Sequence, residues 1–305
     1  MNLEGIIPVW KEAGFTSHDV VAKSRKILQT SKIGHSGTLD PLVTGVLPLC
    51  IGRATRLIEY LQEMPKEYEA VMLIGVSTDT QDLSGTIIDS VTKVDLSDEI
   101  IRRTVATFQG NIQQMPPMYS AVQVNGKRLY ELAREGIEVS RPSRTVCLHE
   151  IHVTSIQEVE PYIEVSFRVV CSKGTYIRTL CVDIGQSLGY PAVMKSLIRT
   201  STGELRETQC VTLKQMEYLK DNNQLSSCML PMDHAVKHLP MLTVTQEQTT
   251  HLFHGKIISM TTFPEVESHS EYRICRAYTS GQHFIGIVEW DPLHHSVRAV
   301  KLFHS

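Results

Sequence analysis

An acidic residue held between glycines and a proline is the first feature of this sequence that could do chemistry. The segment from Gly34 to Pro41 reads Gly-His-Ser-Gly-Thr-Leu-Asp-Pro. Pro41 restricts Asp40 to extended backbone conformations, and the two glycines allow close backbone approach or a positive φ. Such a loop can present the Asp40 carboxylate in a fixed geometry. The alternative interpretation is an Asp-Pro turn that only ends a strand.

Composition describes an ordinary folded protein. The chain has 305 residues, of which 42% are hydrophobic and 21% are charged, enough for a substantial core and more than one domain. Its seven cysteines are scattered and form no CxxC pair, which favours reduced, mostly buried thiols and argues against a zinc site. Because we find neither a membrane-length apolar run nor a secretory signal, we expect a cytoplasmic protein.

The charge of the chain is informative only locally. A formal net charge of -3 argues weakly against a nucleic-acid partner, but binding depends on patches rather than on the total. Basic residues do gather in two regions, namely Lys23, Arg25, Lys26 and Lys32, and Lys127, Arg128, Arg134, Arg141 and Arg144. Each region is either a solvated face or a phosphate-binding patch.

Strands and helices interleave along the chain without the regular spacing of a doubly wound fold, which predicts an α+β protein. The patterns predict strands over 5–10, 68–76, 163–171, 272–277 and 284–290. They predict helices over 18–29 with Ser17 as the N-cap, 54–61, 97–108, 128–135 and 177–188. Near Leu239-Pro240 the pattern changes to short strands, which indicates a small β-rich domain with binding as its expected task.

Five segments, in order, resemble the motifs of one protein family. The Asp40 loop, continued through Gly45-Val46-Leu47-Pro48, resembles the central motif of the TruB family of tRNA pseudouridine synthases. The other four segments are Lys11 with Gly14, Thr16 and Ser17; Lys66-Glu67-Tyr68 with Gly75, Thr78-Asp79-Thr80 and Asp82; Gln114 to Ala121; and Cys171 to Leu180. The resemblance spans about residues 5 to 210, and five ordered blocks are far more specific than one glycine-rich loop.

The resemblance implies a role for individual residues. Asp40 matches the catalytic aspartate, Arg178 an arginine that pairs with it, and Tyr68 the tyrosine that packs on the target base. Further implied positions are Tyr176 as an active-site aromatic, Leu197 as an apolar wall of the base pocket and His35 as a shape and stacking element near the flipped base. The residues expected to bind RNA are Lys11, Lys23, Lys26, Lys32, Lys127, Arg128, Arg144 and Lys173.

The implied chemistry agrees with these residue types. Isomerising uridine means breaking its N-glycosidic bond, turning the uracil and reattaching it through C5. No electrons leave and no water or phosphate is activated, so we expect no cofactor and no metal. A carboxylate suffices, whether Asp40 attacks the uracil ring, attacks the ribose or removes a ribose proton. A neighbouring Arg would keep it ionised by lowering its pKa, and an aromatic such as Tyr68 can hold a base taken out of its stack.

The resemblance also implies architecture and partners. It implies the pseudouridine synthase fold over residues 1–238, with a mixed, mostly antiparallel sheet, flanking helices and an RNA-binding insertion at about 123–145. Residues 239–305 resemble a small PUA-like β-barrel that binds RNA, with Gly255 in a glycine turn; a β-rich cap without RNA contact is the alternative.

The expected partner is tRNA, modified at uridine 55 of the TΨC arm, with no membrane, guide RNA or protein partner. Two rivals are an RNA-folding helper, a role that could coexist with catalysis, and the catalytic subunit of a guide-RNA ribonucleoprotein.

Three positions depart from the family pattern. Glu12 replaces a stiffening proline, Gln123 stands where a lysine is usual, and Leu205 stands where an aromatic is common. These changes bear on local rigidity and RNA contacts and leave Asp40 and Arg178 untouched.

Overall fold

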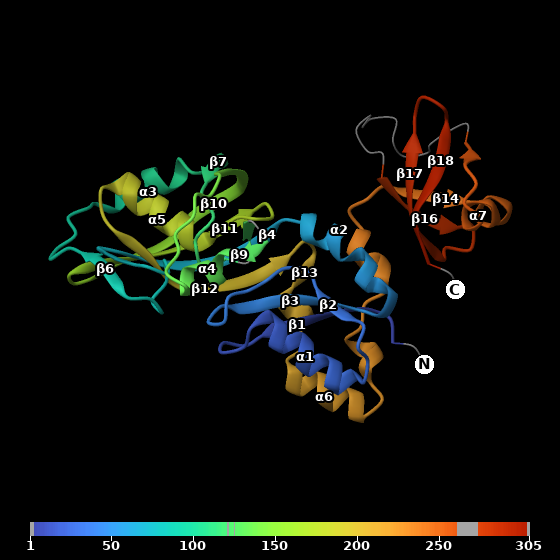
Figure 1. Ribbon diagram of the computed structural model, residues 1–305, viewed down its shortest axis with the longest axis horizontal. Coiled ribbons are helices and arrows are strands. Elements are labelled where there is room, and N and C mark those ends of the chain that lie inside the picture. Colours follow the sequence, from blue (N-terminus) through green and yellow to red (C-terminus); the bar gives the residue numbers. More distant parts are fainter. Residues whose placement is uncertain (1–2, 121, 125, 261–273, 304–305) are drawn as a thin grey trace.

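The computed structural model describes residues 3–120, 122–124, 126–260 and 274–303, which form a central body with a smaller C-terminal sheet at one end (Figure 1). Within these residues the body has one nine-stranded sheet of order β1-β3-β12-β4-β11-β10-β7, with β2 beside β3 and β13 beside β12. Its strands are β1 (Gly5–Lys11), β2 (Ile33–His35), β3 (Thr44–Ile51), β4 (Lys66–Ile74), β7 (Gly110–Gln114), β10 (Arg144–Val159), β11 (Tyr162–Cys171), β12 (Ala192–Thr202) and β13 (Leu205–Arg206). Only β12 and β3 pair in parallel among the described strands of this sheet, so the predicted mixed, mostly antiparallel sheet is confirmed.

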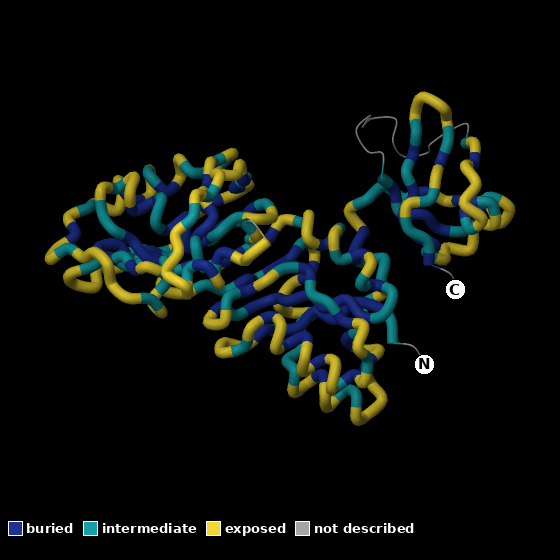
Figure 2. The backbone as a smooth tube through the Cα atoms, viewed as in Figure 1, coloured by how far each residue is buried: buried dark blue, intermediate teal, exposed yellow. Residues whose placement is uncertain are grey.

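Alternation of apolar and polar residues explains the centre of this sheet. Along β4 and β11 every second residue is buried, as expected of strands that cover a core on one face. That face packs against α3 (Asp98–Ala106) and α5 (Ile177–Leu188), whose Ile101 and Leu180 are fully buried with Phe167 of β11. Figure 2 shows the buried strands inside and the exposed turns outside.

The first helix starts one residue earlier than predicted. Helix α1 (Ser17–Leu28) is capped by Thr16, whose side chain forms a capping box with Asp19, so the prediction that Ser17 is the N-cap is wrong. The Ser17 hydroxyl instead accepts the backbone N–H of Leu39 at 2.8 Å and lies 3.2 Å from its carbonyl oxygen. Helix α1 packs beside α6 (Leu213–Asp221) under β1 and β3 (Figure 1).

The helices predicted over 54–61, 97–108 and 128–135 are present with shifted ends, whereas the short ribbons and the later 3-10 turns were not predicted. The predicted helix over 54–61 is a 3-10 turn, η1 (Gly52–Leu57), followed by α2 (Ile58–Glu63). The insertion forms a ribbon of β8 (Gln123–Val124) and β9 (Lys127–Arg128) before α4 (Leu129–Arg134); Ala121 and Asn125 lie outside the described residues. A second ribbon joins β5 (Val76–Thr78) to β6 (Ile87–Ser90), and further 3-10 turns are η2 (Glu207–Gln209), η3 (Leu225–Ser227) and η4 (Met232–Val236). All seven cysteines are free, as predicted.

The C-terminal part is a curled five-stranded sheet, in agreement with the predicted PUA-like β-domain. Its order is β14 (Met241–Val244), β16 (Ile274–Thr279), β17 (Phe284–Asp291), β18 (Ser296–Leu302) and β15 (Ile258–Ser259), with α7 (Gln246–Phe253) at its side. Gly255 has a φ of +73° in the predicted glycine turn. Of the strand predicted over 272–277, residues 272 and 273 lie outside the described part.

The two parts share one hydrophobic cluster at their junction. Ile287 and Phe303 of the C-terminal part pack with Leu57 and Val236 of the body. Arg56 donates to the carbonyl oxygen of Leu302 at 2.8 Å and its guanidinium lies 4.9 Å from the Phe303 ring centroid. The C-terminal sheet is therefore seated on η1 and η4. No helix of the described chain is long and apolar enough to cross a membrane.

Candidate active site

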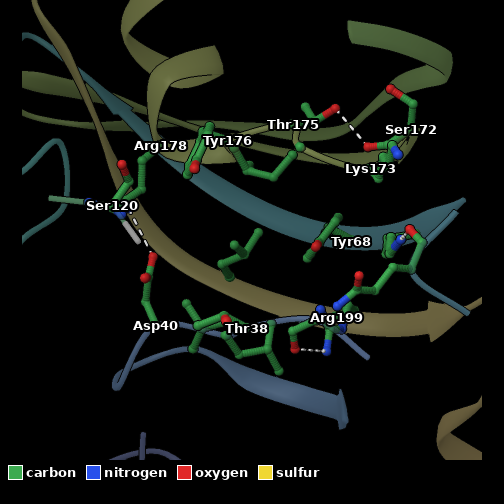
Figure 3. Close-up of a pocket in the computed structure, with 18 of the residues that line it drawn as sticks. Thr38, Asp40, Tyr68, Ser120, Ser172, Lys173, Thr175, Tyr176, Arg178 and Arg199 are labelled. Carbon is green, nitrogen blue, oxygen red and sulfur yellow. Dashed lines mark hydrogen bonds and ion pairs between the residues drawn. The ribbon is translucent and has the colours of Figure 1, made fainter. Parts of the chain in front are cut away.

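A cavity of about 590 Å³ opens between the Asp40 loop and the centre of the main sheet. Its lining comes from the loop between β2 and β3, from β4 and β12, from the start of α5 and from residues near 120 and 144. Figure 3 shows Asp40 on one side of this cavity, with Arg178 above it and Tyr68 and Arg199 farther along. Segments distant in sequence therefore converge on one space.

Asp40 and Arg178 form an ion pair at the edge of the cavity. The Nε of Arg178 lies 2.9 Å from Oδ2 of Asp40. The Arg178 side chain is only 6% exposed, and its two other nitrogens donate to the carbonyl oxygens of Thr80 at 2.9 Å and Tyr119 at 2.8 Å. The Asp40 side chain is 39% exposed, so the fixed guanidinium holds a carboxylate that still faces the cavity.

The environment of Asp40 works in two directions on its pKa. Burial raises the pKa of Asp40 above its ordinary value, and Asp82 adds to this rise. Arg178 and, more weakly, Lys11 lower the pKa. The arginine lowers the pKa as expected, but the raising effects of burial and Asp82 together outweigh the lowering effects, so the pKa of Asp40 lies above its ordinary value.

Lys11 holds the Asp40 loop from behind and is not available to RNA. Its side chain is 0% exposed, and its Nζ donates to the carbonyl oxygens of Val43 at 2.6 Å, Pro41 at 3.0 Å and Glu12 at 3.2 Å. Burial lowers the pKa of Lys11 to about 8. The prediction that Lys11 contacts RNA is therefore wrong, because all three of its donors are used inside the protein.

The opposite side of the cavity is aromatic and apolar. Tyr68 is buried on β4, and Leu197 lies on the neighbouring strand β12, in register with Ala70. Tyr176 directly precedes α5, and its backbone is held by Gln114, whose amide donates to its carbonyl oxygen at 3.0 Å and accepts its N–H at 2.7 Å. These side chains line the same cavity as Asp40 and provide a face on which a planar base can stack.

His35 turns toward its own loop. Its Nδ1 accepts the backbone N–H of Gly37 at 3.3 Å, and the described lining of the cavity does not include it. Burial and the charge of Arg199 lower the pKa of His35, which favours the neutral ring. His35 thus contacts its own loop, and its predicted role beside the flipped base stays a prediction.

The sequence prediction assigned no role to several polar groups of the cavity. Arg199 is 2% exposed and Lys66 is 6% exposed, and burial lowers the pKa of Lys66 to about 8. The hydroxyls of Ser36 and Ser120 are buried and have no hydrogen-bond partner among the described residues. The one available signal for Arg199 was its charge in β12, a strand in which Lys195 is the one other charged residue.

The exposed basic residues spread over a wide surface. Lys23 and Lys26 lie on α1, Lys32 precedes β2, and Lys127 and Arg128 lie on β9 of the insertion. Of the seven exposed residues predicted to bind RNA, the two that line the cavity are Arg144 and Lys173. Within the described chain no group of three or more His, Cys, Asp or Glu side chains is arranged to hold a metal ion.

Leu205, one of the three departures from the family pattern, is buried on β13 in the cluster at the domain junction. Glu12 and Gln123 are exposed.

Known proteins resemble this chain over most of its length. Residues 25–177 match the TruB family pseudouridylate synthase (N terminal domain), and residues 178–237 match the tRNA pseudouridylate synthase B C-terminal domain. The tRNA pseudouridine synthase B of Bacillus pumilus is 45% identical over 261 residues, covering 85% of this chain and 84% of that protein. The protein of the same name from Streptococcus agalactiae is 48% identical over 259 residues, covering 84% and 88%.

Solved structures resemble the fold of this chain as well. A chain in the structure of an H/ACA RNP bound to a substrate RNA containing 2'-deoxyuridine superposes with a TM-score of 0.71 at 25% identity, covering 99% of this chain and 85% of that one. With the matched domains, the relatives and the converging motifs, this chain belongs to the TruB family of pseudouridylate synthases.

Proposed function

We propose that this protein isomerises uridine 55 of the TΨC arm of tRNA to pseudouridine, with Asp40 as the catalytic carboxylate. The observation that carries the proposal is the Asp40–Arg178 ion pair at 2.9 Å, open to a cavity with an aromatic wall. Relatives 45% and 48% identical over more than four-fifths of the chain, named tRNA pseudouridine synthase B, support the substrate class.

The reaction needs only bond exchange at one nucleoside. The C1'–N1 bond breaks, a C1'–C5 bond forms, the hydrogen of C5 is lost and N1 regains one. Asp40 acts on the ribose or on the ring as base or nucleophile, and Arg178 keeps it ionised and oriented. Tyr68 and Leu197 hold the extruded uracil while it turns. The reaction has no net oxidation, so it consumes no redox equivalent.

The names of the relatives and the exposed basic residues indicate the partner and the surface that binds it. We propose that the protein acts on free tRNA in the cytoplasm, without a guide RNA or protein partner, because the relatives with 43–48% identity are tRNA enzymes by name. The catalytic domain is taken to run from residue 1 to 238, with a PUA-like RNA-binding domain over 239–305. Phosphates are expected to meet Lys23, Lys26, Lys32, Lys127, Arg128, Arg144 and Lys173.

Mapping pseudouridine along an unmodified tRNA transcript tests the proposal. We expect the purified protein to modify uridine 55 alone, without added protein or RNA. Absence of modification, or modification at another position that persists in Asp40→Asn, would show that the proposed function is wrong.

A further inference from the structure

The buried guanidinium of Arg199 has no part in the function described so far. It lies on β12, lines the cavity and is 2% exposed. The ion pairs among the described residues include none with Arg199, whereas Arg178 has Asp40. A buried guanidinium without a carboxylate is costly unless its donors are satisfied. Its hydrogen bonds therefore indicate why the fold retains it.

These hydrogen bonds hold β3 and the Asp40 loop. The Nε of Arg199 donates to the carbonyl oxygen of Val46 at 2.7 Å, and Nη2 lies 3.2 Å from the carbonyl oxygen of Gly37 in the Asp40 loop. Burial raises the pKa of Tyr68, and the charge of Arg199, its cross-strand partner, lowers that pKa. Figure 3 shows Arg199 between Tyr68 and the loop that carries Thr38. One side chain thus joins the loop of the carboxylate to the aromatic wall.

The sheet fixes Arg199 in this position. On one side Arg199 is the cross-strand partner of Tyr68 on β4, and on the other it is paired with Gly45 on β3. A Cβ on Gly45 would lie 2.2 Å from the Arg199 carbonyl oxygen, so glycine is required for this close approach. The backbone of β12 is therefore held between the two strands that flank the cavity.

Arg199 differs from Ser17 and Lys11, two other side chains that hold the loop. Ser17 holds Leu39 and Lys11 holds Pro41, but neither Ser17 nor Lys11 lines the described cavity. Both therefore fix the loop against the body only. Of these three side chains, Arg199 is the one that also lies opposite Tyr68 in the sheet.

We infer that Arg199 is a positioning residue, which sets the Tyr68 wall and the Asp40 loop at one separation. This inference rests on the proposed function, because that separation decides whether a uracil stacked on Tyr68 brings its ribose to the carboxylate. The planar fork of an arginine suits the task, since it can donate to two acceptors at once, whereas a lysine is a single point of charge. A misplacement of about 1 Å at a reacting centre can cost about 100-fold in rate.

The test compares Arg199→Lys and Arg199→Met with a matched control. Arg168→Met removes an arginine from β11, the strand on the other side of β4; this arginine pairs with Glu67 at 2.5 Å and does not line the cavity. We expect Arg199→Met to slow single-turnover chemistry at saturating enzyme by about 100-fold, and Arg199→Lys by less. The Kd for tRNA should stay within about threefold for all three variants.

A spectroscopic readout separates positioning from a general structural effect and needs no activity. In protein labelled with 13Cζ-tyrosine, the Tyr68 signal is identified by its loss in Tyr68→Phe. We expect this signal to move in Arg199→Met, because Tyr68 loses the charge and the support of its cross-strand partner, and to stay in place in Arg168→Met. If Arg199→Met does not fold, Arg199→Lys carries both measurements.

Two results would overturn the inference: a folded Arg199 variant with wild-type chemistry, or an unmoved Tyr68 signal. If the wild-type protein fails to modify tRNA, the proposed function fails, while the Tyr68 signal still decides whether Arg199 positions Tyr68.

Discussion

Arg178 and Asp40 are joined at 2.9 Å, yet the guanidinium is almost fully buried and the carboxylate is not. The other two nitrogens of Arg178 donate hydrogen bonds to the carbonyl oxygens of Thr80 and Tyr119, so the position of the arginine does not depend on Asp40. The charge that favours the ionised carboxylate is therefore built into the fold.

Asp40→Asn should lower the single-turnover rate by at least about 1,000-fold, which corresponds to about 4 kcal/mol of barrier. The amide keeps the size of the side chain but removes its charge and basicity. Binding of tRNA should be nearly unchanged, because it rests on phosphate contacts elsewhere. Asp98→Asn, an exposed position on α3, serves as the control. A rate within about tenfold of wild type would remove Asp40 from the catalytic role.

Arg178→Met should move the acid limb of the pH-rate profile to higher pH. Burial raises the pKa of Asp40, and Arg178 is the main group that lowers it. Loss of the arginine should therefore raise the pKa of Asp40 further. A higher pKa means that Asp40 ionises only at higher pH. Arg178→Lys keeps a charge but loses the fork that also reaches Thr80 and Tyr119, and should be slow with a smaller shift. Single-turnover rates against pH at saturating enzyme measure both; an unmoved limb would contradict the assignment.

Lys11→Met should destabilise the fold by about 1–3 kcal/mol at neutral pH, because buried carbonyl oxygens lose their donor. The deficit should grow with pH. The pKa of Lys11 is about 8 in the folded protein and 10.5 ordinarily, so between these values the folded state binds fewer protons than the unfolded state. The wild type therefore gains stability over the variant from pH 8 to 10.5, and below pH 8 the difference is flat.

Denaturant unfolding of both proteins across pH 7 to about 10.5 measures this difference, in which the titration of other groups cancels. Lys23→Met on the exposed face of α1 is the matched control, because it removes a lysine that does not hold the Asp40 loop. A flat difference for Lys11→Met would show that Lys11 is not held as described.

Phe303→Ala should lower the free energy of unfolding of the whole protein by about 3 kcal/mol. Phe303 is buried at the junction with Leu57 and under Arg56, so its loss opens a cavity between the two parts. Leu293→Ala in the same domain is the control, since Leu293 is 83% exposed. We expect one cooperative transition to shift in a thermal scan. A shift confined to a separate, smaller transition would show that the two parts unfold independently.

The sequence by itself determined the family and part of the secondary structure, although it predicted no strand over β3, β10 or β12. Helix α5 has the predicted bounds, because its apolar spacing and the left-handed Gly189 at its end are local signals. The alternation that defines β4 and β11 is local as well, and ordered motifs named Asp40, Tyr68 and Arg178 together. Where two neighbouring residues could each cap a helix, the prediction missed by one residue: Ser17 was predicted as the N-cap of α1, and the N-cap is Thr16.

Only the tertiary structure decided what the polar side chains do. Ser17 bonds Leu39 and Arg178 meets Asp40 through contacts between segments far apart in the chain, which no local pattern contains. Lys11 resembles a surface cation in sequence, and becomes a buried support because β1 lies beneath the loop. Arg199 acquires its contacts because strand register sets it opposite Tyr68. Burial, and with it the pKa of Asp40, is a property of the assembled fold, since desolvation depends on every segment that closes around the group.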